Sequence, residues 1–555
     1  MTVKFFNKVP KQITDTRAFS NKIFQTKVNN LKENEIKIYD TTLRDGNQGF
    51  GVNFSIEDKL KIARKLSNFG VHYIEGGWPS STNVTEIDFF KKVKLEVIKS
   101  KITAVGMTRR PKVKAKDDEG LKALIETKAD CITIVGKSWK LHVNKVLETT
   151  LEENIAMISD SISYLKNNGY EVFFDAEHYF DGFKEDQEYA SMTVKAAQDA
   201  GAAEIILCDT RGSSLPDQIY EITSATKKIT QIPIGIHTHN DRGLATANSL
   251  FAFMAGATHF QGTVNGIGER CGNANLVEFV GNLEFSLGIR TGLNLKMLTS
   301  LSDYVYEISN QDRNHYLPFV GKYAFAHKGG IHGHAVSKIS EAYESIDPST
   351  IGNERSIVVS SQAGLANVIS KGKEFGFDLK KNDPKAIEIL KEIKTMEASG
   401  YNFENANASL NLIYAKALGK KLDYFNLVNW RAFVIGDEGN IFSEGVVKLS
   451  MDGRTVMTAA EGNGPVNAFD IALKKALESY YPELSEVSLT GYRVREINVE
   501  KGTAAAVQVF IEFKAKRERW STVGVSANIL EASEEALIAG YLYYLYKQRE
   551  KFKSK

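Results

Sequence analysis

The sequence predicts an α/β protein that begins with a (β/α)₈ barrel, continues through a helical linker region and ends in an α+β domain. Three observations predict this architecture. Eight short runs rich in Val, Ile and Phe recur between residues 36 and 266, helical patterns separate them, and two similar strand–strand–helix segments follow after residue 400. Strand then helix, repeated eight times, is the pattern of such a barrel. At 555 residues the chain is also too long for one ordinary domain.

The eight runs have the apolar, β-branched composition of strands buried in a parallel sheet. They are IKIYD (36–40), VHYIEGG (71–77), ITAVGMT (102–108), CITIVG (131–136), YEVFFDAEH (170–178), EIILCDT (204–210), IPIGIHTHN (232–240) and HFQGTVNG (259–266). A doubly wound open sheet is the structural alternative. It is disfavoured because no G-x-G-x-x-G follows the first run.

Helical patterns fill the intervals between these runs. In SIEDKLKIARKLSNFG, Ser55 has the position of an N-cap, Asp58 follows three residues later, and Gly70 ends the helix. Two further helical segments are LEENIAMISDSISYLKNNG and LPDQIYEITSATKKI. Residues from about 301 to 400 are helical in pattern, with glycine-rich interruptions.

The last part of the chain contains an internal repeat. In residues 443–477, two alternating strands are joined by an Asp-Gly turn and followed by a helix, and residues 503–545 have the same order. GNGPVN lacks the Lys-Ser/Thr of a P-loop, so we interpret it as a helix start beside a small regulatory site. A dimerisation module without a ligand is the alternative. We therefore expect four parts: 1–34, 35–300 (the catalytic barrel), 301–400 (the linker) and 401–555 (the regulatory domain).

Composition limits the classes of function. A net charge of +2 gives no basic field for nucleic acid, and no apolar run approaches the roughly 18 residues that span a membrane. Three cysteines without CxxC spacing indicate reduced thiols, hence an intracellular and, we expect, cytoplasmic protein. Residues 1–34 are basic, with Asp15 as the one acid in the first 30. They form either a disordered tail or an organellar, for example mitochondrial, presequence.

Catalytic groups of such a barrel lie at the carboxyl ends of its strands. Polar residues are frequent there: Asp40, Arg44, Asp45, Glu75, Asp175, Glu177, His178, Asp209, Thr210, His237, His239, Asn240, Asp241, Asn265, Glu269, Arg270 and Asn273. The most specific pattern among them is the His-x-His of the seventh run.

His237 and His239 point to the same side of an extended strand, as metal ligands would. With Asp45 as a third ligand they predict a site for a divalent ion, Mg²⁺, Mn²⁺ or Zn²⁺. Two hydrogen-bonded core histidines are the alternative. Arg44 stays protonated, so beside a metal it would polarise a carbonyl or hold alkoxide charge. A surface salt bridge between Arg44 and Asp45 is the other interpretation, although adjacent residues rarely face each other well.

DTTLRDGNQ, GIHTHND and NGIGERCGNANL together resemble the metal-dependent Claisen-condensing acyltransferases, the family of isopropylmalate, homocitrate and citramalate synthases. EGGWP, AFAHKGGIH, IGNERSIVVS and SQAGLANV are most similar to the citramalate synthase branch. The resemblance covers about residues 36 to 550.

The resemblance implies a role for particular residues. Asp45, His237 and His239 match the family's metal ligands, with Asn273 at or near the metal. Arg44 matches the arginine that binds the keto oxygen, and Thr210 a contact to the carboxylate of the 2-oxo acid. The implied catalytic glutamate is Glu177. His332 and Tyr343 match a pair that the partner subunit supplies to generate the acetyl-CoA enolate.

The implied reaction condenses acetyl-CoA with pyruvate to (R)-citramalate and CoA in isoleucine biosynthesis, in a homodimer regulated by an amino acid, isoleucine by this resemblance. One alternative is a bulkier 2-oxo acid, as in 2-isopropylmalate or homocitrate synthase. The others are a barrel lyase and a non-catalytic, amino-acid-responsive binding protein. CDTRGSS departs from the family pattern at Arg211, where asparagine is usual. Arg211 would bind a second carboxylate or the CoA phosphates, or point outward.

Overall fold

The computed structural model describes residues 36–80, 84–360, 363–437, 440–497, 502, 504–516 and 518–553. The chain forms two compact units. The first contains residues up to Phe325 together with Ser345–Glu354, and the second contains Ala326–Glu344 and Arg355–Lys555. Residues 1–34, expected to be a tail or presequence, lie outside the described residues, and the expected boundaries at 300 and 400 stay predictions.

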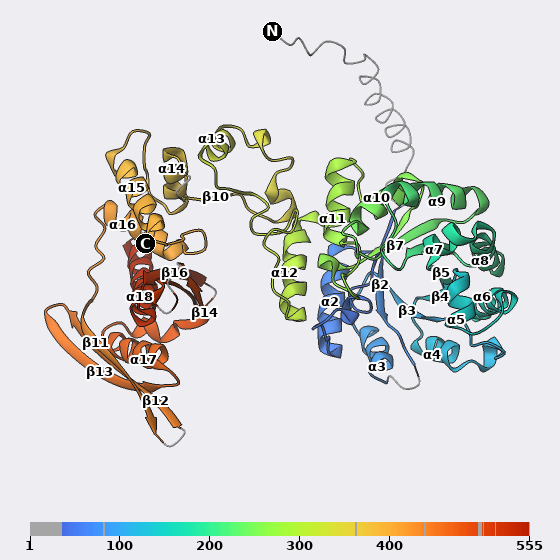
Figure 1. Cartoon of the computed structure of the whole chain (residues 1–555), viewed down its shortest axis with the longest axis horizontal. Coiled ribbons are helices and arrows are strands. Elements are labelled where there is room, and N and C mark those ends of the chain that lie inside the picture. Colours follow the sequence, from blue (N-terminus) through green and yellow to red (C-terminus); the bar gives the residue numbers. More distant parts are fainter. Residues whose placement is uncertain are drawn as a thin grey trace, which may run out of the picture. The chain divides into compact units, whose positions relative to one another are not determined.

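The first unit is built on a closed barrel of eight parallel strands in sequence order, which confirms the predicted fold class (Figure 1). Each strand falls within or beside a predicted run. The strands are β1 (Lys37–Asp40), β2 (Tyr73–Gly77), β3 (Lys101–Met107), β4 (Cys131–Lys137), β5 (Glu171–Glu177), β6 (Glu204–Asp209), β7 (Ile234–Thr238) and β8 (His259–Gly262).

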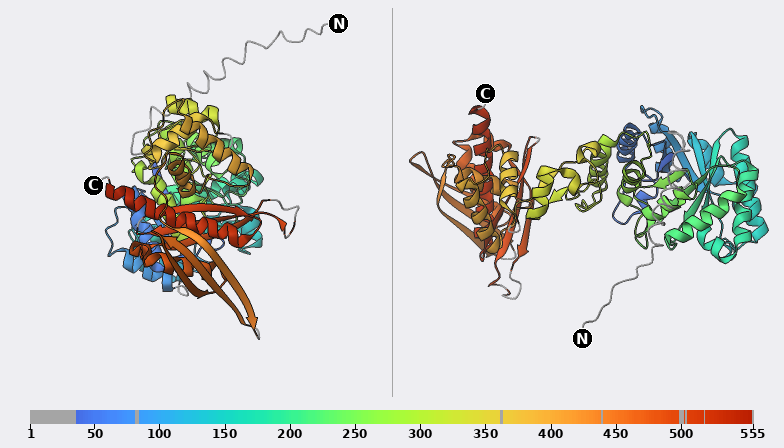
Figure 2. Two further views of the ribbon diagram at one scale, coloured as in Figure 1. Left: turned by 90° about the vertical axis from the view of Figure 1, so that its left-hand side faces the viewer. Right: turned by 90° about the horizontal axis from the view of Figure 1, so that it is seen from above.

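Helices surround the barrel, as Figures 1 and 2 show. They are α2 (Ile56–Phe69), α3 (Val84–Val93), α4 (Glu119–Thr127), α5 (Lys140–Lys145), α6 (Leu151–Asn167), α7 (Tyr179–Glu185), α8 (Gln187–Ala200), α9 (Pro216–Ile229), α10 (Ala245–Met254), α11 (Leu276–Gly281) and α12 (Leu298–Ser309). Helix α2 begins and ends as its sequence predicts. The Ser55 side chain accepts from the Asp58 backbone N–H, the Asp58 carboxylate accepts in return, and Gly70 ends the helix with a φ of 103°.

Two layers of side chains follow from the alternation along the strands. Inward residues such as Tyr39, Phe173 and Cys208 fill the barrel interior. Outward residues join the helices in a larger apolar core. The register also places Met107 beside Val135, Lys137 beside Glu177 and His237 beside Gln261. These pairs lie toward the carboxyl ends of the strands, the end of the barrel at which the candidate site lies.

The second unit begins with helices and ends in two sheets, each covered by a helix. The helices of its first part are α13 (Gly330–Lys338), α14 (Leu365–Glu374), α15 (Pro384–Ala398) and α16 (Asn407–Ala417), with the short parallel pair β9 (Ala326–His327) and β10 (Ser356–Ile357). The helical pattern predicted for this region agrees with these elements.

The repeat contains one more strand per unit than the sequence predicts. One sheet consists of β11 (Asn426–Asp437), β12 (Asn440–Met451) and β13 (Arg454–Gly462), followed by α17 (Pro465–Glu478). The other consists of β14 (Ser488–Glu496), β15 (Val507–Ala515) and β16 (Glu518–Ser526), followed by α18 (Ile529–Lys553). The edge strands β11 and β14 each contain a bulge that interrupts the alternation of apolar and polar residues. The predicted Asp-Gly turn joins β12 to β13, and GNGPVN leads into α17.

Helix α17 packs so closely on its sheet that two strand positions exclude a side chain. A Cβ at Gly445 would lie 2.6 Å from the Ala468 backbone, and one at Gly462 would lie 2.4 Å from it. No helix among the described residues has both the length and the apolar composition needed to cross a bilayer.

Candidate active site at the barrel mouth

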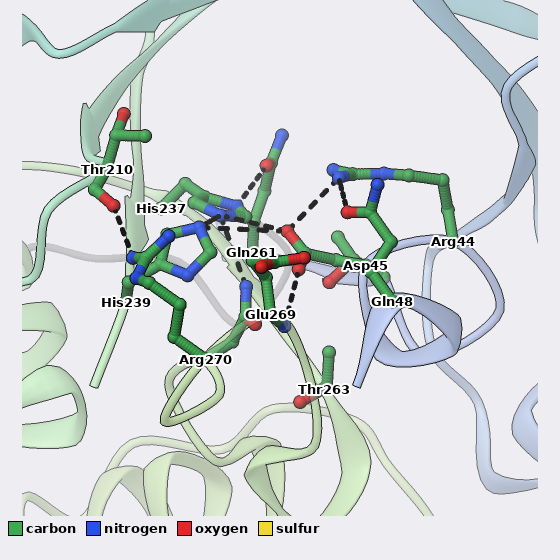
Figure 3. A network of polar contacts seen from close by, with 12 residues as sticks. Arg44, Asp45, Gln48, Thr210, His237, His239, Gln261, Thr263, Glu269 and Arg270 are labelled. Carbon is green, nitrogen blue, oxygen red and sulfur yellow. Dashed lines mark hydrogen bonds and ion pairs between the residues drawn. The ribbon is translucent and has the colours of Figure 1, made fainter. Parts of the chain in front are cut away.

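Asp45, His237 and His239 form a buried cluster at the rim made by the carboxyl ends of the strands, here called the barrel mouth (Figure 3). The Asp45 Oδ2 atom lies 3.5 Å from His237 Nε2 and 3.8 Å from His239 Nε2, and the two imidazole Nε2 atoms are 3.4 Å apart. Two nitrogens and one oxygen thus face one small space, as the ligands of a divalent ion would.

Further contacts orient His237 for ligation. Its Nδ1 lies 2.9 Å from Gln261 Oε1, and the Gln261 amide donates to Asp175 Oδ1 at 3.1 Å. An Nδ1–H held by the glutamine leaves Nε2 with its lone pair toward Asp45, the tautomer that a metal requires. Burial raises the pKa of Asp175 to about 7, so this carboxyl ionises only near neutrality.

The charges of the cluster favour an anionic Asp45. Although burial alone would raise the pKa of Asp45, the Arg44 guanidinium and the two histidines hold it well below its usual range. Burial and the neighbouring His237 lower the pKa of His239 to about 3, so this ring is neutral at pH 7. Burial opposes protonation of His237 as well, but Asp45 raises its pKa overall. Protons and a divalent ion would therefore compete for this ring.

Arg44 is a buried member of the site. Its Nη1 donates to Asp45 Oδ2 at 3.1 Å, its Nε donates to Glu75, and 13% of its side chain is exposed. Adjacent residues face each other here because the chain turns: Arg44 N and Gly46 N both donate to the Thr41 carbonyl. This excludes the surface salt bridge. Burial alone would lower the pKa of Arg44, but Glu75 and Asp45 together raise it above its usual value. The guanidinium therefore stays protonated at all accessible pH values.

Asn273 completes the surroundings of His237. Its Nδ2 lies 3.2 Å from His237 Nε2, and its Oδ1 is buried without a hydrogen-bond partner among the described residues. An amide oxygen left alone beside a carboxylate and two imidazoles fits a site for a cation. The donor set therefore suits the divalent ion that the sequence predicts.

The other predicted barrel residues lie nearby. The Thr210 hydroxyl accepts from the His178 backbone N–H at 2.9 Å, and the Thr210 carbonyl accepts from Arg270 at 2.7 Å. Glu177, at the end of β5, pairs with Lys137 at the end of β4. The short distance between the ends of neighbouring strands brings these groups to the same mouth.

Strands β3 and β4 lie across the closed barrel from β7 and β8. Met107 and Val135 pair in register there and are half-buried, whereas His237 and Gln261 are buried. The wall opposite the candidate ligands therefore includes two apolar side chains, and the Lys137–Glu177 ion pair lies beyond them at the strand ends.

His332 and Tyr343 belong to the second unit, separate from the barrel residues. Their rings lie together, with centroids 4.5 Å apart, and 48% of Tyr343 is exposed. Arg211, the departure from the family pattern, is half-exposed; its Nη1 lies 3.6 Å from Asp181 Oδ1, and its guanidinium lies over Trp139.

Sequence reasoning gave no role to three residues that contact the predicted ones. Glu75 was expected at the mouth but without a function, and Lys137 and Gln261 were not singled out. A signal exists in each case: the side chain is polar and lies at an inward position near the end of a strand.

Comparisons with known proteins agree with this architecture. The sequence model of the family described as HMGL-like matches residues 35–305, and that described as the LeuA allosteric (dimerisation) domain matches residues 404–545. The Homocitrate synthase post-HMGL domain-like family matches residues 319–400. The barrel, its mouth and the two following regions thus define an acyltransferase-type synthase.

Full-length relatives narrow this class. (R)-Citramalate synthases from Aquifex aeolicus and Geobacter sulfurreducens are 47% and 46% identical, each over 93% of this chain and 99% and 98% of the relative. The enzyme of that name from Synechocystis sp. is 44% identical over 93% of this chain and 97% of the relative. The chain belongs to the (R)-citramalate synthase family.

Proposed function

We propose that this protein condenses acetyl-CoA with pyruvate and water to give (R)-citramalate and CoA. One observation carries the proposal: the buried Asp45, His237 and His239 cluster has the Arg44 guanidinium against it. The full-length similarity to (R)-citramalate synthases supports the choice of substrates.

The cluster and its neighbours would hold and orient a 2-oxo acid. Asp45, His237 and His239, with Asn273 beside them, would hold a divalent ion, Mg²⁺, Mn²⁺ or Zn²⁺. When bound, such an ion supplies Lewis-acid polarisation of a keto oxygen. Arg44 faces that oxygen and stabilises the negative charge that develops on it, and Thr210 positions the carboxylate.

A base must remove a proton from the methyl group of acetyl-CoA. Glu177, or His332 with Tyr343 of the partner subunit, serves as this base. The proton is weakly acidic, so positioning must contribute much of the rate. The resulting enolate carbon forms a bond to the keto carbon of pyruvate. Water then hydrolyses the thioester, and CoA leaves as the thiol.

The two apolar side chains on the opposite wall support a substrate with a small apolar group. Met107 and Val135 lie on strands across the barrel from β7 and β8, and we place the side chain of the 2-oxo acid beside them. Such a wall accepts a methyl group. A bulkier acid, as in 2-isopropylmalate or homocitrate synthase, remains the alternative substrate.

The C-terminal region gives the proposed enzyme a regulatory part. Residues 404–545 match the LeuA allosteric (dimerisation) domain, which supports a homodimer with amino-acid feedback. We propose isoleucine as the feedback ligand, because its synthesis would consume citramalate, and the cytoplasm as the location.

Thiol release tests this proposal. Purified protein with Mn²⁺ or Mg²⁺ and acetyl-CoA is mixed with pyruvate, 2-oxoisovalerate or 2-oxoglutarate, and free CoA is followed with a thiol reagent. We expect release with pyruvate, inhibition by isoleucine, and loss of release in Arg44→Ala. Release with a bulkier acid alone would move the protein to a neighbouring branch. If folded, metal-loaded protein releases no thiol with any of the three acids, the synthase proposal is refuted.

A further inference from the structure

Lys137 is a buried lysine at the carboxyl end of strand β4. Its Nζ pairs with Glu177, the residue opposite it on β5. Thr133 of the same strand shares a hydrogen bond with the Tyr39 hydroxyl inside the barrel. Because side chains alternate along a strand, Lys137, four positions later, points inward as well. A lysine is rarely buried, since its ammonium loses its hydration. The chain therefore places a cation inside the candidate active site.

Neighbouring contacts fix the end of β4. The Lys137 carbonyl accepts a hydrogen bond from Nδ2 of the buried Asn154 at 2.8 Å, and the same Nδ2 lies 2.8 Å from the Tyr189 hydroxyl. The Ser138 N–H donates to the Glu177 carbonyl at 3.0 Å, which continues the pairing of the two strands past their ends. The backbone that carries the ammonium is thus held in place, as a donor to a developing oxyanion requires.

The two carboxylate oxygens of Glu177 have different surroundings. Oε2 is paired with the Lys137 ammonium. Oε1 lies 4.0 Å from His178 Nε2, beyond hydrogen-bond distance, and accepts no hydrogen bond from a residue that the structure describes. The Glu177 side chain is 21% exposed, so solvent reaches it. One oxygen is thus bound to a cation, and the other is left for a water molecule.

A second lysine–glutamate pair on the same barrel offers a comparison. Lys101, the first residue of β3, pairs with Glu171, the first residue of β5, at 2.6 Å. There the lysine is the more exposed partner, with 51% of its side chain exposed against 29% for the glutamate. At the mouth the order is reversed, with 10% for Lys137 and 21% for Glu177. Joining two strands does not require a buried cation, so the pair at the mouth calls for a second role.

One step of the proposed reaction requires such a pair. After the enolate carbon has bonded to pyruvate, the product is still a CoA thioester, and water must attack its carbonyl carbon. That attack needs a base for the water proton and a donor for the charge on the carbonyl oxygen. A carboxylate held as an anion by an ammonium is a weak base, and water gives up a proton more readily than a methyl group does. The pair therefore suits the hydrolysis better than the enolisation.

We propose that Lys137 is a further catalytic residue, which acts with Glu177 in the hydrolysis of this thioester. The inference rests on the proposed function. It assigns removal of the methyl proton to the other candidate base, His332 with Tyr343 of the partner subunit. An ammonium carries three N–H donors, so Lys137 keeps its contact with Glu177 while it donates to the carbonyl oxygen.

The step balances in atoms and charge. Glu177 Oε1 takes one proton from the water while the water oxygen bonds to the carbonyl carbon, and the Lys137 ammonium stabilises the oxyanion that forms. When this intermediate collapses, the carbon–sulfur bond breaks and the CoA sulfur takes the proton from Glu177. The new carboxylic acid loses its own proton to solvent. Glu177 is then an anion again and Lys137 is unchanged, so the pair is ready for the next turnover.

The test compares Lys137→Met with Lys101→Met, which removes the cation of the other pair. Protein in excess over acetyl-CoA is mixed with pyruvate and Mn²⁺, quenched with acid and analysed by mass spectrometry. We expect Lys137→Met to accumulate citramalyl-CoA, the thioester before hydrolysis. Its hydrolysis of added citramalyl-CoA should be slower by about 10²–10³-fold, the usual effect of losing one oxyanion donor. Lys101→Met should hydrolyse citramalyl-CoA at the wild-type rate and accumulate none.

Two further variants separate this role from a loss of folding. Lys137→Arg retains a cation and should hydrolyse citramalyl-CoA faster than Lys137→Met does. Glu177→Gln should accumulate the same thioester, and its combination with Lys137→Met should lose less activity than the product of the two single losses, because the two residues act in one step. The Kd for Mn²⁺ should stay at the wild-type value in each variant.

Three results would overturn the role of Lys137 while leaving the synthase intact. One is hydrolysis of added citramalyl-CoA by Lys137→Met at the wild-type rate. Another is loss of the condensation itself with normal Mn²⁺ binding, which would assign the pair to an earlier step. The third is an equal loss of hydrolysis in Lys101→Met. Wild-type protein that releases no thiol with any 2-oxo acid would instead refute the proposed function, and this inference with it.

Discussion

Replacing Gln261 with methionine removes the contact that orients one candidate metal ligand. Gln261 is fully buried and bridges His237 Nδ1, at 2.9 Å, and Asp175 Oδ1, at 3.1 Å. Methionine has a similar length but offers neither an amide donor nor a carbonyl acceptor. The His237 ring then loses the partner that selects its tautomer, and Nε2 faces Asp45 for only part of the time.

The magnitude follows from the contacts that are lost. Loss of a hydrogen bond to a ligating histidine typically costs 10- to 100-fold in metal affinity, about 1.4–2.7 kcal/mol. We expect the Kd for Mn²⁺, measured by isothermal titration calorimetry at pH 7.5, to rise by about that factor. The metal-free protein should also lose about 1–3 kcal/mol of stability for each buried group left without its partner.

Two variants separate orientation from general damage. Gln261→Glu keeps an acceptor for the His237 Nδ1–H, so Mn²⁺ affinity should stay within about threefold of wild type, although its carboxylate faces Asp175. Gln198→Met alters a glutamine on α8 whose side-chain oxygen accepts from the Gln231 backbone N–H, and should leave Mn²⁺ binding unchanged. Wild-type Mn²⁺ affinity in Gln261→Met would refute the role of this hydrogen bond.

Three further outcomes are expected. Because the pKa of Asp175 is about 7 when folded and about 3.9 when unfolded, the native state holds its extra proton between these values and stability falls as pH rises. The free energy of urea unfolding of metal-free protein should therefore fall by about 3 kcal/mol less in Asp175→Asn than in wild type between pH 5 and pH 8. Equal decreases in the two proteins would contradict this. Val135→Ala should raise the ratio of the rate with 2-oxobutanoate to the rate with pyruvate by about tenfold, because one methylene is worth about 1–3 kcal/mol. An unchanged ratio would mean that the side chain of the acid lies elsewhere. Gly445→Ala should destabilise the second unit by about 1–3 kcal/mol, because its Cβ would meet the Ala468 backbone. The control Gly436→Ala, whose Cβ would meet nothing within 4 Å, should not destabilise it. Equal melting temperatures of the two variants would refute the clash.

The barrel was predictable because its strands are buried on both faces. Burial on both sides requires continuous apolar runs, and these are visible in a sequence without knowledge of tertiary contacts. Strands β11 and β14 lack that signal. Their side chains are mostly exposed where described, and each strand contains a bulge, so their pairing depends on a neighbouring strand more than on their own composition.

The same distinction applies to the site. His237 and His239 were predictable because side chains two positions apart on one strand lie on the same face. Gln261 and Lys137 were not, because their roles depend on the register between neighbouring strands, which places them beside His237 and Glu177. The Arg44–Asp45 contact was unexpected, because a tight turn brings together side chains that would diverge on a strand.

The charges at the mouth favour a monocarboxylic 2-oxo acid. While Asp175 is protonated, Arg44 carries one positive charge against the two negative charges of Glu75 and Asp45, so a divalent ion would leave a net charge of +1. One substrate carboxylate neutralises it. Three further cations at this mouth already face carboxylates: Lys137 with Glu177, Arg270 with Asp241, and Arg211 with Asp181. The second carboxylate of 2-oxoglutarate would have to compete with one of these, whereas pyruvate needs no cation beyond the cluster. Because removing a carboxylate from water without a partner costs several kcal/mol, this charge balance favours pyruvate over the dicarboxylate independently of the sequence resemblance.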